Sequence, residues 1–301
     1  MDTWQSHLWL IQDIVDVSTI KELCFRVLLD SNAGSGSILG RRLLESLGCE
    51  VTLLGGEPTG QFLHPPEPTT DNLVGVRQQV VDACVEVGFC QDPDADRLAV
   101  LDENGRYIGE EYTLALCLDH VLRERKGPVV TNCATSRMAE DLAAKYSVPF
   151  HRAAVGEANV VDKMLEVGAV FGGEGSGGPI DPRVGLVRDS FVGMALILAA
   201  MASRDPRVSK LADELPRYEI RKATVQLATD KLPAALSAIE KHFTDAKADR
   251  LDGLRLDWAD RWVIIRGSNT EPIVRIIAEA RTAAATDELV ATISQLVGKL
   301  T

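Results

Sequence analysis

Gln91-Asp92-Pro93-Asp94-Ala95-Asp96-Arg97 lies between two short apolar segments, 87–90 and 98–101, and the rest of the sequence is best understood from it. The apolar segments predict two buried strands, and the stretch between them predicts a tight loop. Alternate spacing lets three carboxylates on such a loop converge on one point, where they repel each other unless a divalent cation neutralises them. Hard oxygen ligands suit magnesium, and Arg97 adds a positive group beside it. The loop therefore predicts a Mg²⁺ site formed by Asp92, Asp94 and Asp96.

Three other interpretations of this loop compete with the metal site. A solvated turn is the simplest, but surface turns seldom place three aspartates directly at the end of a buried strand. An EF-hand needs a glycine and a distal glutamate at positions that this stretch does not offer. A haloacid-dehalogenase-type site also begins with Asp-x-Asp after a strand, but a Thr or Val and a helix normally follow. Here Arg97 and another strand follow.

Outward from the loop, short apolar strands alternate with helices up to about residue 215, and hairpins replace the crossovers after that. This pattern predicts an α/β fold: two α/β domains with mixed sheets, followed by a smaller α+β C-terminal domain. Gly127-Pro128 and Pro216 mark the expected boundaries. We therefore expect a leading helix over residues 1–24 and a domain with the acidic loop over 25–127. A second α/β domain should cover 128–215, and a C-terminal domain should cover 216–301.

The composition is that of a globular protein with a strong negative charge. The chain has 301 residues, 46% of them hydrophobic, and a formal net charge of -12. This charge argues against nucleic acid and anionic membranes as partners, and an anionic small substrate would need a local cluster of arginines. No stretch reaches the length of a membrane span, and no basic signal region opens the chain. The six cysteines form no C-x-x-C pair, so we expect buried thiols in the reducing cytoplasm.

Two further loops follow expected strands. Residues 172–178 (GGEGSGG) let the backbone approach a ligand closely, and Glu174 and Ser176 are the only side chains there that could bond a polyol. Residues 266–272 (RGSNTEP) supply the hydroxyl, amide and guanidinium donors that a phosphate cradle requires. The expected phosphate contacts are Arg266, Ser268, Asn269, Thr270 and the nearby Arg275. A flexible glycine linker and a hairpin with a polar tip are the alternatives.

These three loops, in this order, resemble the α-D-phosphohexomutase superfamily, whose members interconvert hexose 1-phosphates and 6-phosphates of glucose, mannose, glucosamine or N-acetylglucosamine. The resemblance covers nearly the whole chain. It implies that Asp92, Asp94 and Asp96 bind Mg²⁺ with Arg97 in support, although Pro93 and Ala95 replace the usual glycines.

The same resemblance implies roles for the other two loops. Glu174 and Ser176 match residues that contact sugar hydroxyls, while Gly178 stands where many relatives have His. The terminal loop matches the superfamily's phosphate-binding loop. Residues 155–159 (VGEAN) resemble another loop near the sugar, without the Lys that many relatives carry there.

One superfamily motif is not found in the sequence. Relatives begin with a domain whose Ser-His-Asn-Pro loop carries the phosphorylated serine, and no such tetrapeptide occurs here. Ser6-His7 is followed by Leu8 and is interpreted as chance within a helix. We therefore expect residues 1–24 to be the end of that first domain, the domain itself to be a missing partner, and this chain alone to be inactive.

Two other functions are compatible with parts of this sequence. Gly34-Ser35-Gly36 and Gly40, with Glu57 further on, resemble a dinucleotide-binding turn, but the third glycine falls one residue late. A non-catalytic sugar-phosphate-binding protein would keep the same ligand loops. The motifs do not distinguish among the hexose phosphates.

Overall fold

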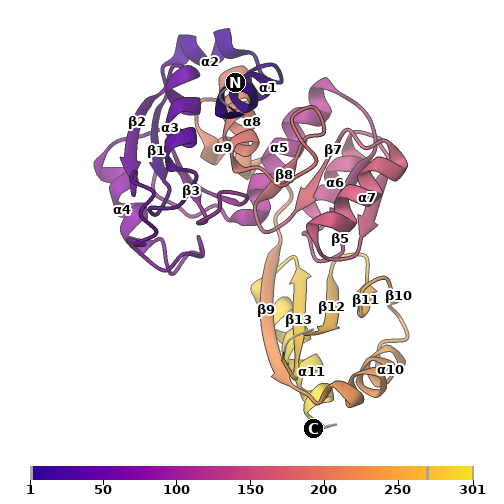
Figure 1. Ribbon diagram of the computed structural model, residues 1–301. Helices are drawn as coiled ribbons and strands as arrows, with labels where there is room; N and C mark the ends of the chain where they lie inside the picture. Colours follow the sequence, from indigo (N-terminus) through magenta and orange to yellow (C-terminus); the bar gives the residue numbers. More distant parts are fainter. Residues whose placement is uncertain (1–2, 269–270, 300–301) are drawn as a thin grey trace.

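The computed structural model describes residues 3–268 and 271–299, and its first unit is a four-stranded sheet with helices (Figure 1). The strand order is β2-β1-β3-β4, with β1, β2 and β3 parallel and β4 antiparallel. Every residue of β3 and β4 is buried, which explains why residues 87–90 and 98–101 are all apolar. The elements are α1 (Thr3–Gln12), α2 (Val17–Leu23), β1 (Arg26–Asp30), α3 (Ser37–Ser46), β2 (Glu50–Leu54), α4 (Val74–Asp82), β3 (Val87–Gln91) and β4 (Leu98–Asp102).

The single helix expected over residues 1–24 is two helices. The first ends at Gln12, and Asp16 caps the start of the second, because its carboxylate accepts hydrogen bonds from the backbone amides of Ser18 and Thr19. An aspartate in this capping position favours a new helix start over continuation. The periodicity of the apolar residues does not reveal such a break.

The second unit repeats the topology of the first. Its strand order is β6-β5-β7-β8, again with three parallel strands and an antiparallel fourth. The turn between β7 and β8 is therefore equivalent in position to the acidic loop between β3 and β4. The elements are α5 (Glu110–Glu124), β5 (Val129–Asn132), α6 (Met138–Lys145), β6 (Phe150–Ala153), α7 (Glu157–Val167), β7 (Phe171–Glu174), β8 (Gly178–Ile180), α8 (Ser190–Ser203) and α9 (Val208–Asp213).

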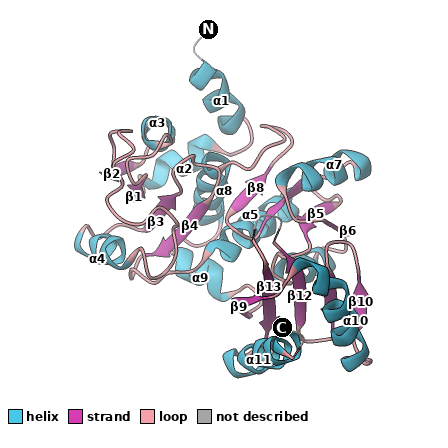
Figure 2. Cartoon of the chain, turned by 60° about the horizontal axis from the view of Figure 1, so that its bottom comes forward, coloured by secondary structure: helices cyan, strands magenta, loops and turns pink. Residues whose placement is uncertain are grey.

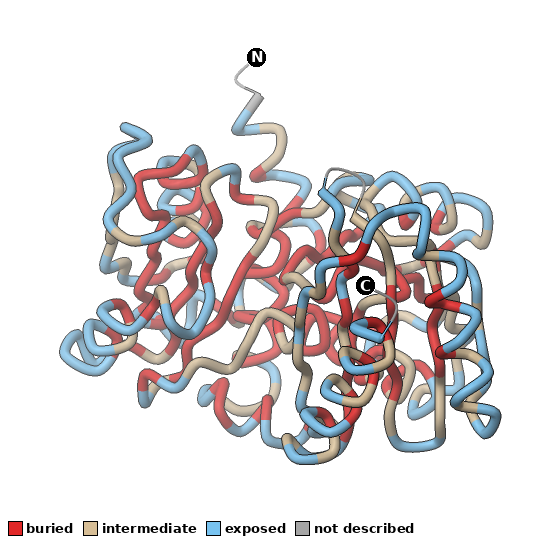
Figure 3. Tube along the Cα trace, turned by 90° about the horizontal axis from the view of Figure 1, so that it is seen from below, coloured by how far each residue is buried: buried red, intermediate tan, exposed pale blue. Residues whose placement is uncertain are grey.

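The two α/β units share one apolar core. It runs from Leu8 to Leu215 and includes the inner faces of both sheets. Figure 2 shows α5 and α8 between the sheets, where α8 packs against β4 and β8 as well as α5. Eleven residues of α8 are buried, so its sequence is apolar around the whole helix. Figure 3 shows the resulting continuous buried interior.

The C-terminal unit is an antiparallel sheet with its own core. The strand order is β10-β11-β12-β13-β9, and α10 and α11 cover it to form a separate apolar cluster. The elements are β9 (Glu219–Gln226), a 3₁₀ turn (Thr229–Lys231), α10 (Leu232–His242), β10 (Lys247–Asp249), β11 (Leu254–Asp257), β12 (Trp262–Gly267), β13 (Ile273–Ala280) and α11 (Ala283–Gly298). The predicted fold class is thus confirmed. Within the described part of the chain, no helix is both long and apolar enough to cross a membrane.

Candidate functional site

The acidic loop places its three carboxylates together. Asp92 directly follows the buried strand β3, and ligand oxygens of Asp92, Asp94 and Asp96 lie within 4.8 Å of one another. Asp92 is buried, Asp96 is partly buried and Asp94 is exposed. The cluster therefore has one open side, as a cation site that must also reach a ligand requires.

Arg97 holds the base of this loop. Its Nε lies 2.6 Å from Asp92 Oδ2, and its backbone amide donates to Asp92 Oδ1 at 3.0 Å. The other end of the guanidinium lies 2.7 Å from a carboxylate oxygen of Glu67, in the long loop that follows β2. Arg97 is thus engaged on both sides, and it fixes Asp92 instead of pointing freely into solvent.

The cluster has the features of a divalent cation site. Asp96 Oδ1 is buried and has no hydrogen-bond partner among the described residues, although Arg97 Nε lies 3.6 Å from it. Burial and the neighbouring Asp92 carboxylate raise the pKa of Asp96 to about 7. Both costs would disappear if a cation were shared by the three carboxylates, because it would pair the buried oxygen and cancel the repulsion. The oxygen donors present therefore fit a hard divalent metal.

The glycine-rich stretch forms a hairpin and not an open loop. β7 ends at Glu174, residues 175–177 make the turn, and β8 begins at Gly178. Gly177 has φ +88°, its carbonyl accepts from the Leu98 amide at 2.9 Å, and a Cβ there would clash with the Leu98 backbone. The glycines thus let this hairpin pack directly on the start of β4.

The buried Glu174 carboxylate accepts hydrogen bonds from several donors. It accepts from Asn132 Nδ2 at 2.6 Å, from the Gly156 amide at 3.0 Å and from Arg188 Nη1 at 2.8 Å. A carboxylate has about four acceptor positions, so roughly one remains for a ligand hydroxyl. The Gly156 contact also brings the predicted 155–159 loop to this site.

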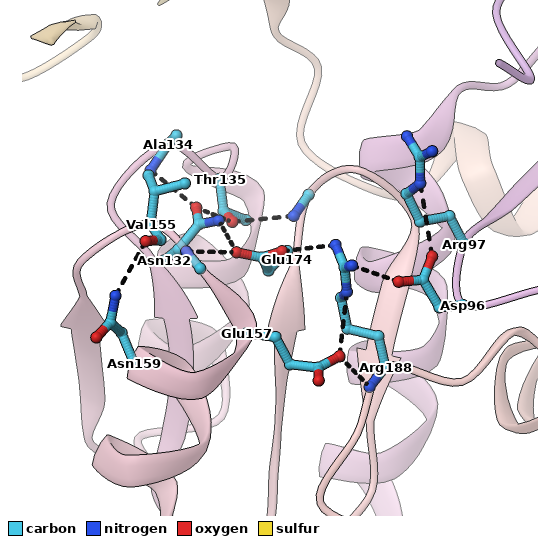
Figure 4. A network of polar contacts seen from close by, with 12 residues as sticks. Asp96, Arg97, Asn132, Ala134, Thr135, Val155, Glu157, Asn159, Glu174 and Arg188 are labelled. Atoms are coloured by element: carbon cyan, nitrogen blue, oxygen red, sulfur yellow. Dashed lines mark hydrogen bonds and ion pairs between the residues drawn. The ribbon is translucent and has the colours of Figure 1, made fainter. Parts of the chain in front are cut away.

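Arg188 connects the hairpin to the acidic loop. Its guanidinium bonds Glu174 through Nη1 and Asp96 through Nη2, and Nε lies 3.2 Å from Glu157 (Figure 4). The same arginine therefore contacts a predicted metal ligand and a predicted sugar ligand.

The predicted phosphate loop joins β12 and β13. Arg266 and Arg275 lie directly opposite each other on these strands, where like charges disfavour each other. Asp252 lies 3.1 Å from Arg266, while Arg275 is exposed. The Ser268 amide donates to Ile273 O at 2.9 Å. Asn269 and Thr270 lie outside the described residues.

One cleft brings the hairpin and the C-terminal sheet together. It has a volume of about 440 Å³ and is lined by Glu174, Ser176, Arg266 and Arg275, all predicted ligand residues. The three aspartates do not line this cleft; they adjoin it through the Arg188 bridge to Glu174.

Sequence reasoning missed several residues of this site. Lys222, Asn132 and Glu111 also line the cleft, and burial raises the pKa of Glu111 to about 8. Lys222 lies on β9 and Glu111 near the start of α5, and neither belongs to a recognisable motif. Only their positions in space reveal them.

The glycine turn after β1 serves the acidic loop. A Cβ on Gly34 would lie 2.6 Å from Pro93 O, and one on Gly36 would lie 2.5 Å from the Ala95 Cβ. These glycines therefore allow two loops to pack closely, which accounts for the pattern without a dinucleotide.

Comparisons with known proteins agree with this architecture. Models of the phosphoglucomutase/phosphomannomutase family match the chain in three places: alpha/beta/alpha domain II at residues 5–105, alpha/beta/alpha domain III at 109–218 and the C-terminal domain at 222–296. A phosphoglucomutase/phosphomannomutase of Thermococcus kodakarensis is 36% identical over 283 residues, covering 93% of this chain and 62% of the relative. A probable phosphoglucosamine mutase of Methanosarcina barkeri is 32% identical over 279 residues, covering 92% and 62%.

A solved structure gives the same result. A phosphoglucomutase/phosphomannomutase family protein from Burkholderia thailandensis aligns with a TM-score of 0.81 and 27% identity, covering 94% of this chain and 63% of that one. The chain thus spans less than two thirds of the length of these relatives. With three consecutive domain matches and relatives above 30% identity, the chain belongs to the phosphoglucomutase/phosphomannomutase family of the α-D-phosphohexomutase superfamily.

Proposed function

We propose that this chain provides the metal-, sugar- and phosphate-binding surfaces of a phosphohexomutase. Such an isomerase interconverts hexose 1-phosphate and 6-phosphate through a bisphosphate intermediate. The observation that carries the proposal is the shared cleft, in which Glu174 and Ser176 face Arg266 and Arg275 from a different unit of the molecule.

The charges in the cleft support a hexose phosphate as ligand. Arg266 and Arg275 would bind the phosphate that is not being transferred, together with Ser268, Asn269 and Thr270, because guanidinium groups bind phosphate through paired charge-assisted hydrogen bonds. Glu174 and Ser176 would accept and donate to sugar hydroxyls. The names of the relatives support hexoses as the sugar, with glucose, mannose and glucosamine phosphates as candidates.

The acidic loop supports Mg²⁺ as cofactor. Asp92, Asp94 and Asp96 would hold the ion, whose charge would stabilise a phosphoryl group during transfer. Arg97 keeps Asp92 in place through its 2.6 Å ion pair, so the loop does not have to be ordered by the metal alone.

The reactive serine of the superfamily is not provided by any Ser-His-Asn-Pro segment of this sequence. We therefore expect this chain to bind hexose phosphates without interconverting them, and a phosphoserine domain would be the partner that completes the reaction. Robust turnover of glucose 1-phosphate with glucose 1,6-bisphosphate and Mg²⁺ would contradict this part of the proposal.

Calorimetric titration with glucose 1,6-bisphosphate, in the presence and absence of Mg²⁺, tests the binding function. Arg275→Gln should weaken binding about 10- to 100-fold, because a hydrogen bond to a charged group contributes about 1.5–3 kcal/mol. Arg221→Gln is the matched control: Arg221 lies on the neighbouring strand β9, is partly exposed and pairs with Asp287 instead of lining this cleft. An absence of binding, or equal affinity in the Arg275 and Arg221 variants, would refute the proposed site.

A further inference from the structure

Arg188 lies at a position where three carboxylates from three segments meet. It precedes Asp189, the residue that caps α8, and only about a fifth of its side chain is exposed. Its partners are Asp96 from the acidic loop, Glu174 from the hairpin and Glu157 from the start of α7. Arg188 does not belong to any of the sequence motifs described above, and the proposed function assigns it no role.

The two contacts that matter most go to opposite ends of the site. Nη2 bonds Asp96 Oδ2, while Asp96 Oδ1 is buried, has no hydrogen bond in the described part of the chain and lies 3.6 Å from Arg97 Nε, a long ion pair. Nη1 bonds Glu174 Oε2 at 2.8 Å, while Glu174 Oε1 takes the donors from Asn132 and Gly156. Arg188 therefore fixes one oxygen of each carboxylate and leaves Asp96 Oδ1 available to a cation.

The neighbouring backbone makes room for this arrangement. A Cβ on Gly178 would lie 2.5 Å from Arg188 Cδ and 2.8 Å from its Cγ. Heavy atoms do not approach so closely, so any side chain at residue 178 would displace the arginine. Gly178 has no positive φ that would otherwise require glycine.

We propose that Arg188 is a positioning residue that orients Asp96 for the cation and Glu174 for the sugar at the same time, so that cation and hexose phosphate binding are coupled through it. The inference rests on the proposed function and adds a residue and a linkage to it. A residue that hydrogen-bonds a metal ligand without contacting the metal typically contributes to metal affinity. Its removal weakens metal binding about 10- to 100-fold.

Arginine suits this role better than lysine. Its guanidinium is planar, so Nη1 and Nη2 hold two carboxylates at a fixed separation, whereas an ammonium group is a single point charge on a flexible chain. The cation site stays attractive because, among the described residues of this network, carboxylates outnumber guanidinium groups. Two guanidinium groups, Arg97 and Arg188, face the carboxylates of Asp92, Asp94, Asp96, Glu67, Glu157 and Glu174.

The first test compares Arg188→Ala and Arg188→Lys with the unmodified chain. Mn²⁺ affinity is measured by electron paramagnetic resonance, and glucose 1,6-bisphosphate affinity by calorimetry. Both affinities should fall by about 10-fold or more in Arg188→Ala. Arg188→Lys should recover only part of this loss, and added guanidinium ion should partly restore Arg188→Ala. Arg183→Ala is the control, since Arg183 lies on the same connection but pairs with Asp181.

The second test uses Gly178→Ala, which keeps every charge but displaces Arg188. It should reduce Mn²⁺ affinity in the unmodified chain and cause no further loss in the Arg188→Ala background, because the displaced side chain is then absent. Equal losses in both backgrounds would overturn the inference, as would unchanged affinities in Arg188→Ala.

The two proposals fail in different ways. If the unmodified chain binds neither Mn²⁺ nor glucose 1,6-bisphosphate, the proposed function is wrong and the inference falls with it. If the unmodified chain binds both ligands, and Arg188→Ala binds them equally well, the proposed function stands and the role of Arg188 is refuted. If Arg188 couples cation binding to hexose phosphate binding, Mg²⁺ should increase the affinity for glucose 1,6-bisphosphate in the unmodified chain and not in Arg188→Ala.

Discussion

The turn after β3 and the turn after β7 occupy equivalent positions in two sheets with the same strand order, yet their sequences have almost nothing in common. The first turn gathers three carboxylates and must balance their charge, which it does through Arg97 and Arg188. The second turn carries little charge and must instead come close to its neighbour, which Gly177 allows. The shared topology therefore places both turns at the same site. The first turn needs residues that balance its negative charge, and the second needs glycines that allow close packing.

The largest effect should come from breaking the charge balance of the first turn. Asp92→Asn removes a buried carboxylate that pairs with Arg97, and breaking a buried pair costs about 3–5 kcal/mol. Arg97 keeps Glu67 as a partner, so we expect about 3 kcal/mol of lost stability by urea denaturation, within that range. Mn²⁺ binding should become undetectable.

Asp94→Asn is the control for that experiment. Asp94 is exposed, so its substitution should change stability by less than about 0.5 kcal/mol while still weakening Mn²⁺ binding. If the Asp92 and Asp94 variants lost the same stability, Asp92 would not be the carboxylate that anchors the turn.

A somewhat smaller effect should follow from removing the space in the second turn. Gly177→Ala adds a Cβ against the Leu98 backbone at a residue with φ +88°. Steric overlap and left-handed strain should together cost about 2–4 kcal/mol by thermal or urea unfolding. Gly168→Ala provides the comparison: it also has positive φ, but no atom lies within 4 Å of its Cβ position, so only the strain should remain. Equal losses of stability in the two variants would show that steric overlap with Leu98 does not contribute.

A gain of stability is expected at Ala95, in the first turn. This residue adopts φ +62°, a left-handed conformation that costs a non-glycine residue about 1–2 kcal/mol. Ala95→Gly should therefore stabilise the chain by up to about 1 kcal/mol, after the added freedom of the unfolded chain is subtracted. Chemical denaturation measures this change, and Mn²⁺ affinity should stay the same. A clear loss of stability would mean that the buried Ala95 methyl outweighs the strain.

The smallest effects should be pH-dependent and opposite in the two units. In the first unit, the hydrogen bond to Asp30 raises the pKa of His64, so this pair stabilises the fold below pH 6.5 and is lost as pH rises through the raised pKa. In the second unit, burial lowers the pKa of His120, so its contribution is present above pH 6.5 and lost as pH falls.

Melting temperatures between pH 5.5 and 8.5 distinguish these two histidines. The deficit of His64→Gln relative to the unmodified chain should be largest at low pH and shrink toward pH 8.5. The deficit of His120→Gln should be largest at high pH and shrink toward pH 5.5. Parallel curves for the two variants would contradict the opposite pKa shifts.

The site could be predicted from the sequence wherever its chemistry is local. Asp92, Asp94 and Asp96 alternate within five residues, so the convergence that the structure displays was already implied by their spacing. Arg188 could not be found in this way. Its contacts to Glu174, Glu157 and Asp96 span 14, 31 and 92 positions, and nothing in residues 181–188 marks it.

The fold could likewise be predicted only where the sequence pattern is local and clear. β3 and β4 contain the apolar segments 87–90 and 98–101 and lie where the sequence predicts strands, whereas β6 and β10 are polar edge strands that the sequence does not predict. The hairpin of β7 and β8 was not predicted, because glycines in these short strands leave too few side chains to form an alternating apolar pattern. The repeated strand order was also hidden, since the two sheets share a topology without a shared sequence pattern.

The shared apolar core of the first two units has a consequence for how the molecule melts. A continuous set of contacts from Leu8 to Leu215 makes those units one cooperative block, and the C-terminal sheet with its own cluster makes a second, joined to the first by the smaller buried cluster of Cys133, Trp262 and Ile264. Differential scanning calorimetry should then resolve two endotherms instead of three. Because Glu174 lies in one block and Arg275 in the other, a bound sugar phosphate would bring the two endotherms together.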